Sequence, residues 1–322
     1  MIINKKENKI KTSQGYDEFW KFACERQNVF IKRSLGELDN LTSDVIIKQF
    51  KFTNTYRASD RVSQYLIKNV IYSKKYNAED TVFRILLFKL FNKIETWELL
   101  ETELGEISTK SFSSSRYSKI LDHAMDNKVR IYSNAYMMAS GAKEFPVKRK
   151  HHAHFLLLDK MLKEQLPLRV QDSNSMEEAY NLILSYPMIG QFLAYQYITD
   201  INYSEVTNFS ECEFTVPGPG AKDGIRKCFQ SKGGYSDSDI IKMLTERQED
   251  EFKRLNLDFK YLDKRKLQYI DIQNIFCETD KYCRVALPEL AGFSGRTRIK
   301  QKFKINHSVI DLFYPPKWNI RM

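Results

Sequence analysis

Apolar residues recur at helical spacing along most of this 322-residue chain, and polar segments separate the apolar runs. The longest such pattern runs from Asp80 to Leu104, with Gly105 near its end. Two or three helices are also expected between residues 17 and 66, and single helices are expected at 117–127, 154–165, 224–230 and 237–255. The pattern therefore predicts a mainly α protein.

Two helical patterns flank a short turn at residues 184–194. Ser175 and Glu178 have capping-box spacing for the first helix, Pro187 and Gly190 mark the turn, and an apolar helix restarts over residues 191–199. A helix that begins on glycine-bearing backbone offers free N–H groups to a phosphate. An ordinary helical hairpin without a ligand explains the same pattern equally well.

Two later segments lack helical periodicity. Residues 202–220 form the longest such stretch in the middle of the chain and carry Glu205, Glu211 and Glu213, and loops of this length are usually functional. In residues 296–304, five cations alternate with other residues. An extended strand would place these cations on one face, where they could follow phosphates, although a solvated edge strand fits as well.

Composition narrows the class of protein. A hydrophobic fraction of 42% excludes wholesale disorder, and a net charge of +10 favours a polyanionic partner. The five scattered cysteines suit a reducing cytoplasm, and the chain shows no 18-residue apolar stretch and no signal-peptide core, so we expect a cytoplasmic protein without a membrane partner. The histidines at 151, 152 and 154 are interpreted as a solvated helix start, and no metal or cofactor is predicted.

The turn resembles the hairpin of the helix-hairpin-helix DNA glycosylase superfamily. In that superfamily a Pro-Gly-hydrophobic-Gly hairpin grips DNA, and a catalytic carboxylate follows downstream. Residues 187–190 match this pattern except that Met188 replaces the first glycine. Because only glycine adopts positive φ freely, we expect the turn to differ in detail.

Five stretches, at residues 56–65, 83–97, 214–221, 271–282 and 295–301, are similar to a branch of this superfamily. The branch is the α-glutamyl/putrescinyl thymine pyrophosphorylase group, which includes the helical domain named after 5-hydroxymethyl-deoxyuridine DNA kinase. Phage-defence glycosylases that excise glucosylated pyrimidines look similar to it. The resemblance implies a helix-hairpin-helix glycosylase-like bilobal fold over residues 16–303, with two interlocked lobes and a cleft between them. A flexible N-terminus (1–15) and a short basic C-terminal extension with a tail (304–322) would flank it.

Excision of a base requires a flipped nucleotide and a carboxylate that stabilises the developing positive charge on the sugar. Glu213 is the expected catalytic carboxylate because it lies at a suitable distance after the hairpin and before a Gly-Pro-Gly turn. Asp200 is the second choice and Glu211 the third. An ordinary surface carboxylate is the alternative for each of them.

Other residues are candidates for contacts with DNA. Asn92 is the polar break in an apolar run and is a candidate wedge residue. The predicted DNA-binding residues are Pro187, Ile189, Gly190, Gln191, Asn92, Lys222, Arg296, Arg298 and Lys300. Two groups of polar residues are each surrounded by apolar residues in the sequence. They could line a base pocket or simply form a buried polar network. The first group is Tyr56, Arg57 and Asp60, and the second is Asn274, Glu278 and Lys281.

Three functions fit these residues. The favoured one is a monofunctional DNA glycosylase that flips and excises a hydroxymethylated or glucosylated pyrimidine and leaves an abasic site, in anti-phage defence. It would be monofunctional because Phe192 stands where strand-cutting members carry a lysine. The alternative is a hypermodification enzyme acting on 5-hydroxymethyluracil in DNA, either a transferase or a kinase-associated helical domain.

The chain has no Gly-x-x-x-x-Gly-Lys-Ser/Thr loop, which argues against kinase activity in this chain alone. A non-catalytic DNA-binding module that recruits a partner is the third function. The carboxylate-rich loop counts against it, because acidic groups beside DNA are unfavourable unless they have a task.

Overall fold

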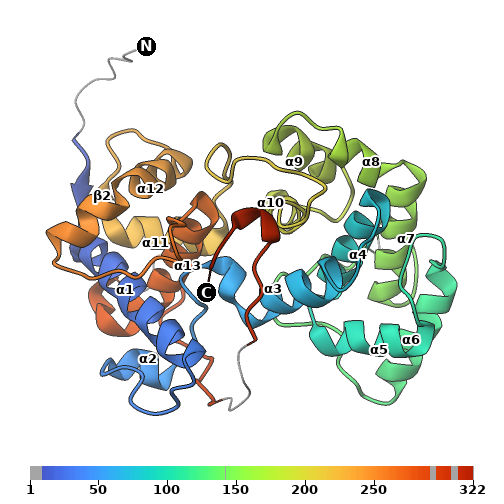
Figure 1. Cartoon of the computed structure of the whole chain (residues 1–322), viewed down its shortest axis with the longest axis horizontal. Coiled ribbons are helices and arrows are strands. Elements are labelled where there is room, and N and C mark those ends of the chain that lie inside the picture. Colours follow the sequence, from blue (N-terminus) through green and yellow to red (C-terminus); the bar gives the residue numbers. More distant parts are fainter. Residues whose placement is uncertain (1–8, 142, 291–294, 306–310, 322) are drawn as a thin grey trace. The chain divides into compact units, whose positions relative to one another are not determined.

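The chain is mainly helical, as the sequence predicts, and it divides into two units (Figure 1). The computed structural model describes residues 9–141, 143–290, 295–305 and 311–321. Unit 1 comprises residues 1–60, 215–312 and 320–322, and unit 2 comprises residues 61–214 and 313–319. Each unit is therefore assembled from segments that are distant in the sequence. Over the described residues, no helix is long and apolar enough to cross a membrane.

Unit 1 is built around helix α13 (Tyr269–Ala286), which packs against α1, α11 and α12 (Figure 1). Phe19 of α1 meets Phe276 of α13 with ring centroids 4.5 Å apart, and Trp20 meets Phe252 at 5.0 Å. The other elements of the unit are β1 (Lys11–Thr12), α1 (Gln14–Ser34), α2 (Val45–Gln49), the 3-10 helices η1 (Arg57–Ser59) and η3 (Pro288–Leu290), α11 (Pro219–Cys228), β2 (Phe229–Ser231) and α12 (Asp237–Arg254). Strands β1 and β2 pair antiparallel.

Helices α11 and α13 approach unusually closely because α11 carries glycine at the contact. A Cβ atom placed on Gly224 would lie 2.0 Å from the carbonyl oxygen of Phe276. Beside this contact, Lys227 of α11 forms an ion pair with Asp280 of α13 at 2.9 Å, and both side chains are fully buried. The Nζ atom of Lys227 also donates to the carbonyl oxygen of Asp280 at 2.7 Å.

Unit 2 is built around helix α4 (Ala78–Phe91), which is buried on nearly all sides and packs against α7, α8 and α10. Its apolar circumference explains this position, because a helix without a polar face is stable only inside the protein. The remaining elements are α3 (Arg61–Tyr65), the π-helix η2 (Leu66–Ile71), α5 (Ile94–Leu104), α6 (Ser114–Asp126), α7 (Lys150–Lys163), α8 (Leu166–Gln171), α9 (Met176–Leu184), α10 (Gln191–Ile201) and the 3-10 helix η4 (Pro316–Trp318).

The structure differs from the sequence prediction at several helix ends. The single helix expected over residues 80–104 is two helices, because Asn92 adopts a left-handed conformation (φ 48°) and ends α4. Gly105, with φ of 73°, ends α5 as predicted. Helix α7 begins at Lys150, and His151 and His154 are fully buried within it. Their interpretation as a solvated helix start is therefore wrong.

Both ends of the chain lie partly outside the described residues. Of the predicted flexible segment 1–15, residues 1–8 are outside, while residues 11–12 form β1 and α1 begins at Gln14. Of the predicted tail 304–322, residues 306–310 and 322 are outside. Residues 296–300 form no regular strand, but Lys302 bridges to Phe50 in antiparallel fashion.

The contact at Gly224 gives a stability prediction. In Gly224→Ala the new methyl group meets backbone atoms, so α11 must move away from α13. We expect a net loss of up to about 2 kcal/mol in the free energy of unfolding, because overpacking costs roughly 1–3 kcal/mol and the gain in helix propensity offsets about 1 kcal/mol. Chemical denaturation measures it. Lys222→Ala, at an exposed position of the same helix, is the control and should change stability by less than about 0.5 kcal/mol.

Candidate functional site

The predicted helix–turn–helix is present in unit 2 as α9, a turn at residues 185–190, and α10. The Ser175 hydroxyl accepts the Glu178 N–H at 3.1 Å, which caps α9 as its spacing predicts. Met188 takes up the left-handed conformation itself, with φ of 68°, whereas Gly190 has an ordinary φ of −89°. The turn therefore keeps a left-handed residue where the glycosylase hairpins have glycine.

Two residues that the sequence suggested separately, Asn92 and Asp200, come together around a third. The Nζ atom of Lys89 lies 2.9 Å from the Asp200 carboxylate and 2.9 Å from the Asn92 side-chain oxygen. All three side chains are almost completely buried. A buried ion pair of this kind is stable only when both charges are matched and hydrogen-bonded.

Aromatic side chains cover this cluster. The Lys89 ammonium lies 4.3 Å from the ring centroid of Tyr136, which is a cation–π contact. The ring of Tyr136 stacks on that of Phe192, the second residue of α10, at an interplanar angle of 9°. Both rings remain partly exposed. The buried charges thus lie directly behind a partly exposed aromatic pair beside the hairpin.

The loop that carries Tyr136 is fixed by buried polar contacts. His154 lies between Tyr132 and the loop, with its Nδ1 atom 2.8 Å from the Tyr132 hydroxyl and its Nε2 atom 2.9 Å from the carbonyl of Ala139. Burial lowers the pKa of His154 to about 4, so the ring is neutral. A neutral ring fits one arrangement, in which Nε2–H donates to Ala139 and Nδ1 accepts from Tyr132. Tyr197 donates to the sulfur of Met138 at 3.0 Å, and burial followed by the charge of Asp200 raises the pKa of this tyrosine.

The other predicted carboxylates lie in the long loop after α10. Glu213 is exposed and accepts the backbone N–H of Met176 at 3.0 Å, which helps to cap α9. The loop itself is ordered by the Asn202 side chain, whose oxygen accepts from Thr207 and from the Phe209 N–H at 3.0 Å each. Sequence reasoning missed Lys89, although a lone lysine within the apolar run of residues 82–91 is a signal that could have found it.

All six predicted base-pocket residues lie in unit 1, in segment 53–60 and helix α13. They are joined by hydrogen bonds: the Arg57 N–H donates to Asp271 at 2.9 Å, and the Asn274 side chain donates to the carbonyl of Asn54 at 2.7 Å. Tyr56 donates to the carbonyl of Arg265, and Glu278 pairs with Lys281 at 2.6 Å. The arrangement connects segment 53–60 to α13 as a polar network.

Asp60 belongs to this network and carries an unusual carboxyl group. Its oxygen accepts the Asn54 N–H at 2.7 Å. Part of the residue remains accessible, but its carboxyl group is enclosed by protein, and this burial raises its pKa to about 7.

The predicted DNA-binding residues fall in both units. In unit 2, Gly190 and Gln191 are exposed, Pro187 is partly exposed, and Ile189 is buried together with Asn92. In unit 1, Lys222, Arg298 and Lys300 are exposed, whereas Arg296 pairs with the buried Asp223. Of the predicted DNA-binding residues, three of the hairpin turn and the cations of unit 1 are therefore accessible, whereas Ile189 and Asn92 are buried.

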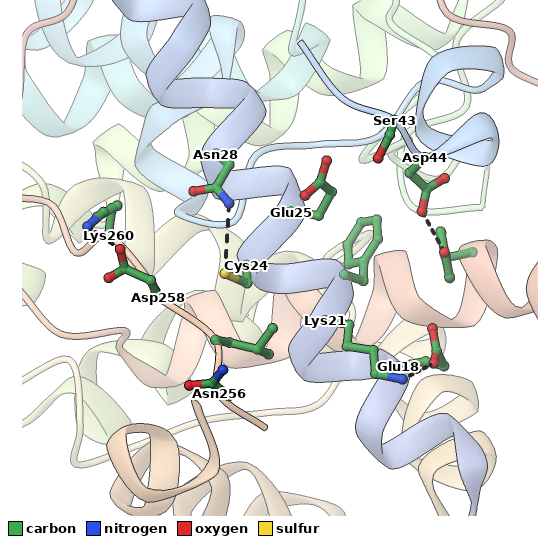
Figure 2. Close-up of a pocket in the computed structure, with 13 residues that line it drawn as sticks. Glu18, Lys21, Cys24, Glu25, Asn28, Ser43, Asp44, Asn256, Asp258 and Lys260 are labelled. Carbon is green, nitrogen blue, oxygen red and sulfur yellow. Dashed lines mark hydrogen bonds and ion pairs between the residues drawn. The ribbon is translucent and has the colours of Figure 1, made fainter. Parts of the chain in front are cut away.

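Unit 1 also contains a cavity of about 560 Å³ beside α1 (Figure 2). Its charged groups are paired: Lys21 with Glu18 at 2.8 Å, and Asp44 with the hydroxyl of Tyr282 at 2.6 Å. Burial raises the pKa of Cys24, also on its wall, to about 11, so the thiol stays protonated. None of the site residues predicted from the sequence lines this cavity.

The mainly helical fold, the hairpin and the buried charges define a helical domain, which comparison with known proteins assigns to a family. The chain belongs to the family described as "5-hmdU DNA kinase, helical domain", whose model matches residues 13–292. A 5-hmdU DNA kinase of Bacillus phage SP10 is 26% identical over 320 residues, which cover 93% of this chain and 49% of that protein. The chain thus spans about half the length of this curated relative. No solved structure matches significantly.

This family membership overturns the favoured function. The prediction of a DNA glycosylase in anti-phage defence is wrong, because the family and the phage relative are named for a kinase. A kinase is a transferase, whereas a glycosylase is a hydrolase of N-glycosyl bonds. The glycosylase role of Glu213, stabilisation of an oxocarbenium-like sugar, falls with it. The alternative, hypermodification of 5-hydroxymethyluracil, fits the comparisons better.

The Lys89–Asp200 pair gives a second stability prediction. Lys89→Met leaves the Asp200 carboxylate buried without its Lys89 partner, and we expect a loss of about 3–5 kcal/mol in unfolding free energy. The double variant Lys89→Met/Asp200→Leu should recover most of that loss, since neither charge of this pair is then buried. Urea denaturation measures both. The exposed pair of Lys160 and Glu164 is the control, where Lys160→Met should cost less than about 1 kcal/mol.

Asp60 gives a pH-dependent prediction. Its carboxyl group has a pKa of about 7 in the folded chain, whereas an unfolded aspartate ionises near pH 4. Between about pH 4 and pH 7 the unfolded chain therefore releases a proton that the folded chain keeps. The free energy of unfolding should therefore fall by on the order of 2–4 kcal/mol as pH rises from about 4 to about 7. Asp60→Asn should flatten this fall in denaturation curves recorded across the window, and an unchanged slope would contradict the assignment.

Proposed function

We propose that this chain binds DNA that contains 5-hydroxymethyluracil and presents the modified base for phosphorylation. The observation that carries the proposal is the family match over residues 13–292. The net charge of +10 supports a polyanionic partner. The phage relative, named a 5-hmdU DNA kinase, supports the choice of base and of reaction.

The chain would bind the DNA substrate, and it would not bind the nucleotide that donates the phosphate. Its sequence has no Gly-x-x-x-x-Gly-Lys-Ser/Thr loop to hold the phosphates of a nucleotide. The phage relative is about twice as long as the matched region. We therefore assign the phosphate donor to a nucleotide-binding partner, whether in the same polypeptide or in another.

The Lys89–Asp200–Asn92 cluster is our candidate for the base side of the site. In phosphoryl transfer, a carboxylate orients the attacking hydroxyl and accepts its proton. Asp200 has that chemistry, and Lys89 holds the carboxylate in place at 2.9 Å. The partly exposed rings of Tyr136 and Phe192 offer a surface on which a flipped base can stack. A displacement of these rings would be needed to bring the hydroxymethyl group to Asp200.

The helix-hairpin-helix fold and its DNA contacts belong to the same proposal. Helix α10 begins at Gln191, and its N-cap residue Gly190 has no side chain to cap it, so the first N–H groups can meet a phosphate. The exposed cations Lys222, Arg298 and Lys300 would contact further phosphates from unit 1. Phosphate contacts of this kind set affinity but not the choice of base.

Binding to matched oligonucleotides tests this function. Fluorescence anisotropy should show that the chain prefers DNA with 5-hydroxymethyluracil to the same DNA with thymine. Asp200→Asn should reduce that preference by roughly tenfold to a hundredfold, because a hydrogen bond to a charged group contributes about 1.5–3 kcal/mol. Affinity for thymine DNA should stay the same, since the phosphate contacts remain.

Glu213→Gln is the matched control, because this exposed carboxylate caps α9 and should leave the preference intact. Circular dichroism verifies that each variant is folded. Equal affinity of the wild-type chain for both DNAs would refute the proposed function. A preference that survives Asp200→Asn would move the base site elsewhere in the chain.

A further inference from the structure

Three potential metal ligands from helices α6 and α7 of unit 2 converge. Figure 1 shows where these two helices lie. Asp122 comes from α6, and His151 and His152 come from the first turn of α7. The Nε2 atom of His151 lies 3.0 Å from Oδ1 of Asp122, and that of His152 lies 2.9 Å from Oδ2. All three ligand atoms lie within 4.8 Å of one another.

The burial and the hydrogen-bond geometry of the His151 ring suggest a ligand at this position. The side chain is fully buried, and its ring nitrogens face two acceptors, the Ser118 backbone and the Asp122 carboxylate, without the geometry of a good hydrogen bond to either. The Nε2 atom is close to the Asp122 carboxylate, but its direction departs from that of a hydrogen bond. A buried polar group without such a bond costs about 1–3 kcal/mol. A cation held between the ring and the carboxylate would satisfy both.

The ligand set suits a divalent transition metal. His151 and His152 each offer an imidazole nitrogen, and Asp122 offers a carboxylate oxygen. Two imidazoles and a carboxylate bind zinc at about 2.0–2.2 Å, with water in the fourth position.

The positive charge of Arg149 lies beside Asp122 and would repel a metal ion bound there. Arg149 contacts the Asp122 carboxylate at 3.0 Å and Asp126 at 2.6 Å. Its guanidinium is partly exposed and also donates to the backbone carbonyl of Asp122 at 3.2 Å. It can therefore remain on Asp126 and the backbone while the Asp122 carboxylate turns to a metal.

We propose that Asp122, His151 and His152 form a zinc site that clamps α6 to α7. The bond between the two helices would add to their apolar packing and fix the start of α7. The same helix carries His154, which holds the loop of Tyr136. The proposal is independent of the function proposed above, since it requires neither DNA nor a nucleotide.

Zinc titration of the whole chain after chelation tests the site. Calorimetry should show one zinc ion per chain, and thermal unfolding should shift to higher temperature with added zinc, because the metal binds the folded state. Cobalt in place of zinc should give the visible absorption of a low-symmetry nitrogen–oxygen site. His152→Ala and Asp122→Asn should each weaken binding by at least about tenfold, since even outer-sphere partners of a metal contribute about 10–100-fold.

Two further variants separate this site from adventitious binding. His123→Ala removes an exposed histidine next to Asp122 and should leave zinc affinity unchanged. Arg149→Ala removes the opposing charge and should tighten binding. Circular dichroism verifies that the ligand variants are folded, and these two remain informative if a ligand variant is not. Absence of zinc binding by the wild-type chain, equal affinity in His152→Ala, or an unchanged affinity in Arg149→Ala would overturn the proposal.

Discussion

Each unit of this protein encloses a lysine–aspartate pair, and the need to match buried charge constrains the helices that carry it. In unit 2, Lys89 of α4 meets Asp200 of α10, and in unit 1, Lys227 of α11 meets Asp280 of α13. Removing a charge from water is unfavourable unless its partner is correctly placed. The two pairs therefore favour one alignment of each helix pair over others that would bury the same apolar surface. Apolar packing supplies most of the stability, and the ion pairs make it specific.

Local signals in the sequence predicted several helix boundaries, although α11 begins at Pro219 and not at residue 224 as expected. The Ser175 cap, the end of α5 at Gly105 and the start of α12 at Asp237 each depend on residues within one turn of the boundary. The break at Asn92 was not predicted because apolar spacing continues on both sides of it. Its left-handed conformation belongs to a cluster completed by Asp200, more than a hundred residues later, and no local pattern contains that information.

The site was harder to predict than the fold for the same reason. Asn92 and Asp200 were both candidates, but only the fold shows that Lys89 joins them. The histidines at 151 and 152 were set aside because no carboxylate lay at ligand spacing, and Asp122 reaches them from another helix. The function was misassigned because a short turn pattern such as residues 187–190 does not specify the reaction, whereas the family match points to a kinase. A fold supports many reactions, and only particular side chains distinguish a hydrolase from a transferase.

Met188 shows how a turn can contain a left-handed residue that is not glycine. A left-handed backbone costs a non-glycine residue about 1–3 kcal/mol, and packing must offset this cost. The Met188 side chain packs against Gly141, where an added Cβ would lie 2.6 Å from its sulfur. Positions 141 and 188 are therefore sterically coupled. A glycine at 188 would remove only one of the limits on position 141, because Gly141 has a φ of 73° and an added Cβ would also lie 2.9 Å from the Cβ of Ala153.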